Sequence, residues 1–147
     1  MQLGIRLHDL APGSLEERLA SARRQGVCCG HLALKKVLSD YPGNEALTPG
    51  YAMYLRRLFR RYDMDVAVLG NYQNLANPDP VQLRRIQQGY YEHIRFAALL
   101  GAGVVGTETG APNVGYIEDT PEGRSEEALA AFIRNLRPVV ACAERFG

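Results

Sequence analysis

The chain has 147 residues, of which 46% are hydrophobic and 22% are charged, as is ordinary for a globular domain. Its formal net charge of +1 gives no electrostatic basis for binding nucleic acid or an anionic membrane surface. No apolar run approaches the roughly 20 residues of a membrane span, and the N-terminus lacks the basic-then-apolar layout of a signal peptide. We therefore expect a single cytoplasmic domain, residues 1–147, without a nucleic-acid or membrane partner.

Three cysteines suit a reducing compartment and offer no disulfide framework. Cys28 and Cys29 are adjacent inside an apolar stretch, so we expect them to be small core residues. The usual spacing of zinc-binding cysteines is absent from the sequence.

The first half of the chain alternates short apolar strands with helices. Residues 3–7 alternate with period two and predict a strand. Ser14 and Glu17 have the spacing of a capping box, which starts a helix that ends near Gly26. Residues 27–33 predict a second strand, followed by a long connection.

The next strand–helix units begin with proline-containing caps. Thr48 before Pro49 predicts a helix through about Tyr62, and residues 64–69 predict a third strand. Asp79 caps a third helix whose apolar residues recur at steps of three and four and face a sheet: Leu83, Ile86, Tyr90, Ile94 and Ala97.

The last predicted elements follow Gly101, which ends the third helix. Residues 103–107 predict a fourth strand, and a loop over residues 110–124 leads to Ser125, the expected cap of a fourth helix. The apolar side of that helix is expected to carry Leu129, Phe132, Leu136 and Val140.

Strand–helix alternation of this kind predicts an α/β fold with a parallel sheet and right-handed crossovers. The chain supplies four parallel βα units and ends at Phe146-Gly147, where a fifth strand is expected. A closed TIM (β/α)8 barrel needs eight units and typically about 250 residues. We therefore predict half of such a barrel, with its strands in the order one to four and its helices on the outer face.

Gly101, Gly103 and Gly106 match the G-x-G-x-x-G dinucleotide fingerprint, but in a reversed context. The fingerprint needs a strand before it and a helix after it, so that the helix N-terminus faces the pyrophosphate. Here a predicted helix precedes the motif and a predicted strand follows. We interpret the glycines as a helix end and a tight turn.

Polar side chains follow every predicted strand, at the edge where parallel α/β sheets place their chemistry. They are His8 and Asp9, then His31, then Asn71, Tyr72 and Asn74, then Thr107, Glu108 and Thr109. A loop cap explains any one such residue. Their recurrence at all four strand ends predicts a ligand site.

Glu108 is the sharpest candidate, because it follows small and apolar residues and precedes a glycine loop. The alternative for Glu108 is a loop carboxylate that caps local backbone N–H groups. His8 is expected to project into a barrel lumen as a substrate-binding residue, or else to be a satisfied rim histidine. His31, Asn71 and Tyr72 complete the expected substrate-binding set.

Three stretches resemble strand ends of the sugar phosphate isomerase/epimerase family, which has the xylose-isomerase-like barrel. They are Leu3 to Leu10, Leu69 to Leu75 and Val104 to Gly110, of which Gly106-Thr-Glu-Thr-Gly110 is the most specific. The resemblance spans the whole chain and covers the N-terminal half of the family's barrel. It implies an isomerase or epimerase that acts on a small carbohydrate by proton transfer through an enediolate.

The same resemblance implies a divalent metal (Mn, Mg, Co or Zn), with Glu108 as the candidate catalytic residue and metal ligand. The family's main metal-binding carboxylates and histidine come from strands five to eight, which lie outside this sequence. Related abasic-site endonucleases carry a metal-binding histidine roughly where Glu108 falls, which argues against that branch. The alternative to an enzyme is a non-catalytic, truncated half-barrel or a small-ligand-binding module.

The two edges of the predicted sheet lead to an expectation about assembly. Strands one and four each present unpaired backbone groups, and residues 103–107 contain neither Lys nor Pro to protect the edge. An isologous pair would place strand one of one copy beside strand four of the other and close an eight-stranded barrel. We therefore predict a homodimer in which both copies offer Glu108 and His8 to a shared mouth.

Overall fold

The computed structural model describes residues 3–147, and their contacts form two compact units. The first unit comprises the residues up to Asn71 together with Arg95–Gly106. The second unit comprises Tyr72–Ile94 together with Thr107–Gly147. The organisation of residues 1–147 as one domain stays a prediction.

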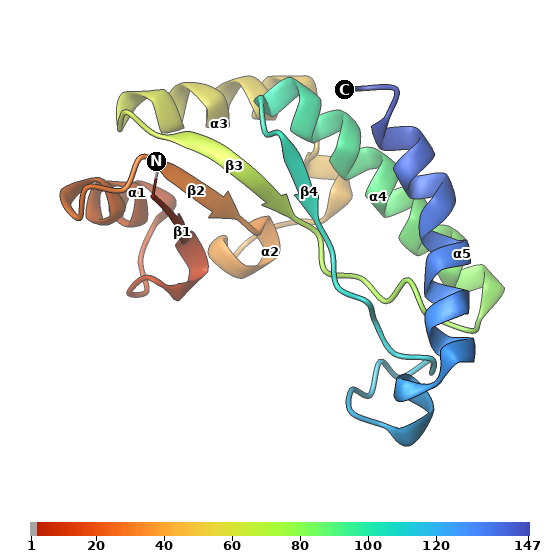
Figure 1. The fold of residues 1–147 in the computed structure, drawn as a ribbon. Coiled ribbons are helices and arrows are strands. Elements are labelled where there is room, and N and C mark those ends of the chain that lie inside the picture. Colours follow the sequence, from red (N-terminus) through yellow and green to blue (C-terminus); the bar gives the residue numbers. More distant parts are fainter. Residues whose placement is uncertain (1–2) are drawn as a thin grey trace. The chain divides into compact units, whose positions relative to one another are not determined.

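The first unit is built on a parallel sheet of four strands in the order β1-β2-β3-β4 (Figure 1). The strands are β1 (Gly4–Arg6), β2 (Cys29–Leu32), β3 (Asp65–Gly70) and β4 (Val104–Gly106). Every neighbouring pair is parallel, which confirms the predicted order and direction.

Short helices connect these strands in the first unit. They are α1 (Leu15–Arg24), α2 (Leu34–Val37) and α3 (Pro49–Arg61), with the 3-10 turns η1 (Leu7–Asp9) and η2 (Asn44–Ala46). The predicted caps are confirmed. The Ser14 hydroxyl accepts from the backbone N–H of Glu17 while the Glu17 carboxylate accepts from the N–H of Ser14, and Thr48 accepts from the N–H of Tyr51.

Two longer helices complete the chain. They are α4 (Pro80–Leu100) and α5 (Glu126–Ala143), the latter preceded by the 3-10 turn η3 (Pro121–Arg124). Asp79 and Ser125 cap them as predicted. Within residues 3–147, no helix combines the length and the apolar character needed to cross a membrane.

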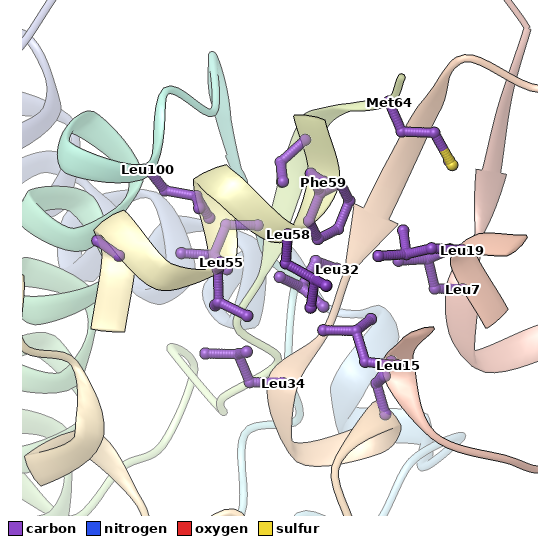
Figure 2. Packing of buried hydrophobic residues seen from close by; sticks show 14 of the residues in the cluster. Leu7, Leu15, Leu19, Leu32, Leu34, Leu55, Leu58, Phe59, Met64 and Leu100 are labelled. Carbon is purple, nitrogen blue, oxygen red and sulfur yellow. The ribbon is translucent and has the colours of Figure 1, made fainter. Parts of the chain in front are cut away.

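The core of the first unit lies between one face of the sheet and its helices (Figure 2). Leucines from β2, β3, α1 and α3 are fully or almost fully buried there with Phe59: Leu19, Leu32, Leu55, Leu58 and Leu69. A Cβ built on Gly30 would lie 3.2 Å from Leu7 and 3.3 Å from Phe59. A glycine in β2 therefore lets the helix layer approach the strand closely.

The opposite face of the sheet is a mixed surface. Arg6, His31, Val68 and Val104 are in register across the four strands, so their side chains share this face. Arg6 and Val104 are exposed, whereas His31 and Val68 are half-buried. The face opposite the core therefore offers charged and imidazole groups beside apolar ones.

The pairing of β2 with β3 contains a bulge. The register passes from the Gly30–Val66 pair directly to the His31–Val68 pair, so Ala67 has no partner on β2. An extra residue of this kind bends a strand and re-aims the side chains that follow it. The bulge lies beside His31.

Two predicted strand ends are wrong in detail. The first strand ends at Arg6, because residues 7–9 turn into η1 instead of extending the strand. The second strand ends at Leu32 and is followed by α2, where the sequence predicted only a long connection. His8 therefore lies in this 3-10 turn, directly after the first strand as predicted.

The predicted apolar stripe of α5 is wrong at two of its four residues, because Phe132 and Leu136 are half-buried but the other two are exposed. Leu129 and Val140 are 49% and 45% exposed, whereas the buried residues are Ala128 and Val139. Asn135 lies on the buried side, where its amide donates to the Leu75 carbonyl at 2.9 Å. The buried side of α5 therefore includes this polar contact and is shifted by about one position from the side that hydrophobicity alone predicted.

Candidate functional site

His8 lies in η1 directly after β1, and Arg18 of α1 holds the loop that carries it. The Arg18 guanidinium donates to the carbonyls of Leu7 and Leu10, both at 2.9 Å, and its Nε donates to the carbonyl of Gly13 at 3.2 Å. Arg18 is itself buried. One side chain thus satisfies three backbone carbonyls and fixes the position of His8.

The rings of His8 and His31 are in contact at the ends of neighbouring strands. Their centroids are 5.3 Å apart and their planes are inclined by 86°, an edge-to-face arrangement. The His8 side chain is only 8% exposed. Its Nδ1 atom is buried without a hydrogen-bond partner in the part of the chain that the structure describes.

Charged groups surround this histidine pair. Arg6 contacts Asp9 at 2.9 and 3.2 Å, and Asp9 Oδ1 lies 3.8 Å from His8 Nε2. Burial lowers the pKa of His8; Arg6 and Lys36 lower it further, while Asp9 opposes the shift. Burial lowers the pKa of His31, and His8, Arg6 and Lys36 act in the same direction. Both shifts favour the neutral imidazole, which carries one donor and one acceptor.

Asn71 follows β3 in the same unit and is buried. Its backbone N–H donates to the carbonyl of Gly106 at 3.0 Å, which extends the pairing of β3 with β4. The sheet therefore fixes this amide side chain at the carboxyl end of β3.

In the second unit, Glu108 lies in the loop after β4 and accepts a hydrogen bond of 2.7 Å from the Tyr116 hydroxyl. Tyr116 has a φ of +54°, which is uncommon for a bulky residue. Burial raises the pKa of Tyr116 well above its ordinary value, and the Glu108 carboxylate raises it further. The hydroxyl therefore stays protonated and donates to the carboxylate.

A second tyrosine, Tyr90 of α4, joins the same network. Its hydroxyl contacts the Thr107 hydroxyl and accepts from the backbone N–H of Gln73 at 3.3 Å. Burial raises the pKa of Tyr90 and its hydrogen bonds oppose that shift, while Glu108 and Tyr72 raise the pKa further. Tyr72 and Glu108 are thus close enough to Tyr90 to act on it electrostatically.

A cavity of about 360 Å³ adjoins Glu108 within the second unit. Its walls include the carboxylates of Glu118 and Asp119, the Arg124 guanidinium and the Thr120 hydroxyl. Asp119 and Arg124 form an ion pair. The volume is in the range of small-molecule sites, and the polar groups suit a ligand rich in hydroxyls.

Asn74, another polar residue after β3, has a structural role. Its Oδ1 accepts from the backbone N–H groups of Ala76 and Ala111 at 3.2 and 2.9 Å, and its Nδ2 donates to the Asn113 carbonyl at 3.0 Å. A Cβ built on Gly110 would lie 2.3 Å from Asn74 Oδ1. The buried Asn74 amide therefore ties two loops of the second unit together. These hydrogen bonds account for the residue without a role in ligand binding.

No protein-family model matches the sequence, and no curated protein matches it. Solved structures do match. A putative xylose isomerase from Rhodospirillum rubrum aligns with 100% of the chain at a TM-score of 0.72 and 19% identity. A D-psicose 3-epimerase from Clostridium cellulolyticum, solved with D-tagatose, aligns with 100% of the chain at a TM-score of 0.71 and 14% identity.

The chain has the fold of half a xylose isomerase-like TIM barrel. It spans about half the length of these proteins, 51% and 50% respectively. The predicted fold class and the predicted resemblance to this barrel are confirmed. Barrels of this type carry their ligand sites at the carboxyl ends of the strands.

The half-barrel brings the predicted residues together in two groups. His8 and His31 are in contact in the first unit, which also holds Asn71. Glu108 and Tyr72 belong to the second unit, where both act on Tyr90. The convergence of both groups on one cleft stays a prediction.

Sequence reasoning missed two tyrosines of the Glu108 network. Tyr90 is part of an apolar helix stripe, so its hydroxyl gave no separate signal. Tyr116 lies in an irregular loop, where no periodicity predicts which side chain meets Glu108. Only the structure reveals that the Tyr116 hydroxyl donates a hydrogen bond to the Glu108 carboxylate.

The resemblance to this barrel implies a divalent metal, and the residues that the structure describes do not fit one. His8 Nδ1 is an orphaned atom of a ligating type. Among residues 3–147, however, no three His, Cys, Asp or Glu side chains gather closely enough to hold an ion. Typical sites use three or more protein ligands.

Proposed function

We propose that this half-barrel binds a small carbohydrate at the carboxyl ends of its strands, as part of an isomerase or epimerase. The observation that carries the proposal is the contact between His8 and His31, 5.3 Å apart at the ends of adjacent strands. Burial lowers the pKa of both imidazoles. A neutral imidazole donates and accepts one hydrogen bond each, which suits the hydroxyl groups of a sugar.

The structural neighbours support the same substrate class. One is the D-psicose 3-epimerase solved with D-tagatose, and another is a D-psicose 3-epimerase solved in the presence of D-fructose, with a TM-score of 0.70 and 10% identity. This chain corresponds to 50% of each of those proteins. We therefore propose, for this chain, the epimerase or isomerase chemistry that the names of those proteins state.

Glu108 is our candidate for the proton transfer. Isomerisation and epimerisation next to a carbonyl both require a base that removes a proton from carbon; the proton then returns to the adjacent carbon in isomerisation, or to the opposite face of the same carbon in epimerisation. Glu108 is exposed beside a cavity, and the Tyr116 hydroxyl orients its carboxylate through a 2.7 Å hydrogen bond. The carbon–hydrogen bond would break toward Glu108, leaving an enediolate that takes the proton back from Glu108 on the adjacent carbon, which gives isomerisation. Epimerisation would need a second acid that protonates the same carbon from the opposite face.

A non-catalytic half-barrel that binds a small ligand is the second candidate function. The observation that favours it is the lack of three clustered metal-ligating side chains among residues 3–147. A divalent metal would then need further ligands, from a second copy of the chain or from another half-barrel. We expect weak Mn²⁺ binding by a single chain.

We also propose that the protein works in the cytoplasm as a homodimer. Three cysteines of the described chain, Cys28, Cys29 and Cys142, are free, as suits a reducing compartment. β1 and β4 are the edges of the sheet, and their pairing between two copies would close an eight-stranded barrel.

Deuterium exchange tests the proposed chemistry. The protein is incubated in D₂O with D-fructose, D-psicose or D-tagatose, with and without Mn²⁺, and the sugars are followed by proton NMR. We expect loss of the C–H signal next to the carbonyl, and no such loss with Glu108→Gln. Glu127→Gln is the matched control, because Glu127 is an exposed carboxylate at the start of α5.

Saturation-transfer NMR on the same samples separates the two candidate functions. Binding without exchange supports the non-catalytic half-barrel, and His31→Ala should then weaken that binding. The absence of both binding and exchange for all the sugars contradicts the proposal.

A further inference from the structure

A second cleft lies in the helix layer of the first unit. It has a volume of about 460 Å³ and is formed by the start of α1, the segment after α2, and α3. Leu15, Leu38 and Leu55 line it together with the rings of Tyr51 and Tyr54. We call it the tyrosine cleft. It contains neither His8 nor His31, so the proposed sugar chemistry does not account for it.

Aromatic rings form one side of the tyrosine cleft. Tyr51 and Tyr54 are nearly parallel, with an interplanar angle of 12° and centroids 6.1 Å apart. Tyr51 is backed by Phe96, whose ring centroid lies 6.0 Å away. Tyr54 is 51% exposed, so ring surface remains accessible. The face of an aromatic ring carries negative charge density and attracts cations.

The charge of the lining is one-sided. Glu16 and Asp40 line the tyrosine cleft, and no Lys, Arg or His is among its lining residues. The Tyr54 hydroxyl donates to Glu16 Oε1 at 3.3 Å, which places a carboxylate beside the rings. Burial raises the pKa of Tyr51, and Tyr54 and Glu16 raise it further. Burial and Glu16 also raise the pKa of Tyr54, while Arg61, which does not line the cleft, lowers it.

The helix N-termini near the cleft do not cancel this potential. A free helix N-terminus favours anions, because its first N–H groups lack partners. At α1, Ser14 and the Glu17 carboxylate already form a capping box. At α3, the Thr48 hydroxyl accepts from Tyr51. The carboxylates therefore determine the local charge preference.

We propose that the tyrosine cleft binds a small organic cation with an apolar body, an aryl or alkyl ammonium. The leucines would cover the hydrocarbon part, the Tyr54 ring would face the charged group, and Glu16 and Asp40 would neutralise it. The cleft has room for such a molecule, because 460 Å³ lies within the range of small-ligand pockets.

Three probes that share a phenyl ring test the charge preference by heteronuclear NMR titration of the full chain. They are benzyltrimethylammonium, benzyl alcohol and benzoate, which are cationic, neutral and anionic. We expect saturable shifts at the amides of α1 and α3 with the cation. The neutral and anionic probes should bind about tenfold more weakly or not at all, the difference expected of a cation–π contact plus a carboxylate.

Matched variants test the residues. Tyr54→Ala should weaken cation binding about tenfold, whereas Tyr54→Phe should retain most of it because the ring face remains. Glu16→Gln should weaken it severalfold, and Glu127→Gln should leave it unchanged. His31→Ala should leave cation binding intact, so the tyrosine cleft and the proposed sugar site can fail separately.

Several results would overturn the proposal. One is equal affinity for benzyl alcohol and the cation, which would mean an apolar cleft without charge preference. Another is unchanged cation binding in both Tyr54→Ala and Glu16→Gln. A third is the absence of saturable binding of the cation. If a thermal melt shows that a variant is unfolded, the comparison of the three probes on the unaltered protein still tests whether the cleft prefers a cation.

Discussion

Burial opposes protonation at His8, His31 and His93. Burial lowers the pKa of each histidine below its ordinary value of about 6.5. At His93 the Gly89 carbonyl, 2.8 Å from Nδ1, opposes the shift without cancelling it. Around and below pH 6.5 the unfolded chain therefore binds more protons than the folded one, so stability should be lost as the pH falls below about 6.5.

Proton NMR of the imidazole Hε1 signals checks this expectation. The chain has three histidines, so assignment by single substitutions is practical. All three should titrate below the value measured for the chain in urea, and the free energy of unfolding should be lower at about pH 5.5 than at about pH 7.5. A His8 or His31 signal that titrates above the unfolded value would contradict the neutral pair.

Gly110 is a second residue whose substitution gives a clear expectation. It has a φ of +81°, and a Cβ there would meet Asn74 Oδ1 at 2.3 Å. Gly110→Ala should therefore disturb the Asn74 hydrogen bonds and lower the free energy of unfolding by about 1–3 kcal/mol. Gly103→Ala is the control, because a Cβ at Gly103 meets nothing within 4 Å. Equal urea midpoints for the two variants would contradict this role of Asn74.

Among the secondary-structure elements, α1 depends on its cap. Ser14→Ala removes the hydroxyl that accepts from the Glu17 N–H, and it should lower the free energy of unfolding by about 1 kcal/mol. Ser14→Asp keeps an acceptor at the same position and should restore most of the loss. Thermal melts of the three proteins compare them directly. An unchanged melting temperature in Ser14→Ala would mean that tertiary packing alone fixes the start of α1.

The sequence predicted those elements whose signals are local. The capping residues Ser14, Thr48, Asp79 and Ser125 act within one helical turn, so their patterns are readable without tertiary knowledge. The rotation of α5 was not predictable, because the contact of Asn135 with the Leu75 carbonyl joins residues 60 positions apart. A polar residue on a buried helix face gives no signal in hydrophobic periodicity.

The candidate site shows the same limit. The sequence pointed to Glu108, His8 and His31 because polar residues at strand ends mark the ligand side of a parallel sheet. It did not predict the ring contact of the histidines, which depends on the η1 turn and on the Arg18 clamp. Nor did it predict the Tyr116 hydrogen bond, which depends on an irregular loop.

At the scale of the whole molecule, the edge strands lead to the homodimer prediction. Val104 on the edge strand β4 is 53% exposed, and charged residues on an edge oppose strand pairing. Light scattering at micromolar concentration should give a dimer mass for the protein and a monomer mass for Val104→Lys. Val114→Lys is the matched control, because Val114 is 51% exposed in a loop of the second unit.

The masses measured for the three proteins test the homodimer and its edge-strand interface separately. A strictly monomeric unaltered protein refutes the homodimer. A dimer that persists in Val104→Lys refutes barrel closure through β4, while the half-barrel fold stands. A monomeric Val114→Lys would show that the effect of lysine is not specific to the edge strand.

The bulge in β3 has a consequence for how this strand tolerates change in length. In a regular strand, deleting one residue turns every following side chain to the other face. Here the register already passes over Ala67, so Val68 pairs with His31 and Leu69 with Leu32 as though Ala67 were absent. Deletion of the Ala67 codon would therefore leave Leu69 in the core and remove the bulge from β3. We therefore expect a deletion at this position, unlike one elsewhere in the strand, to be compatible with the fold.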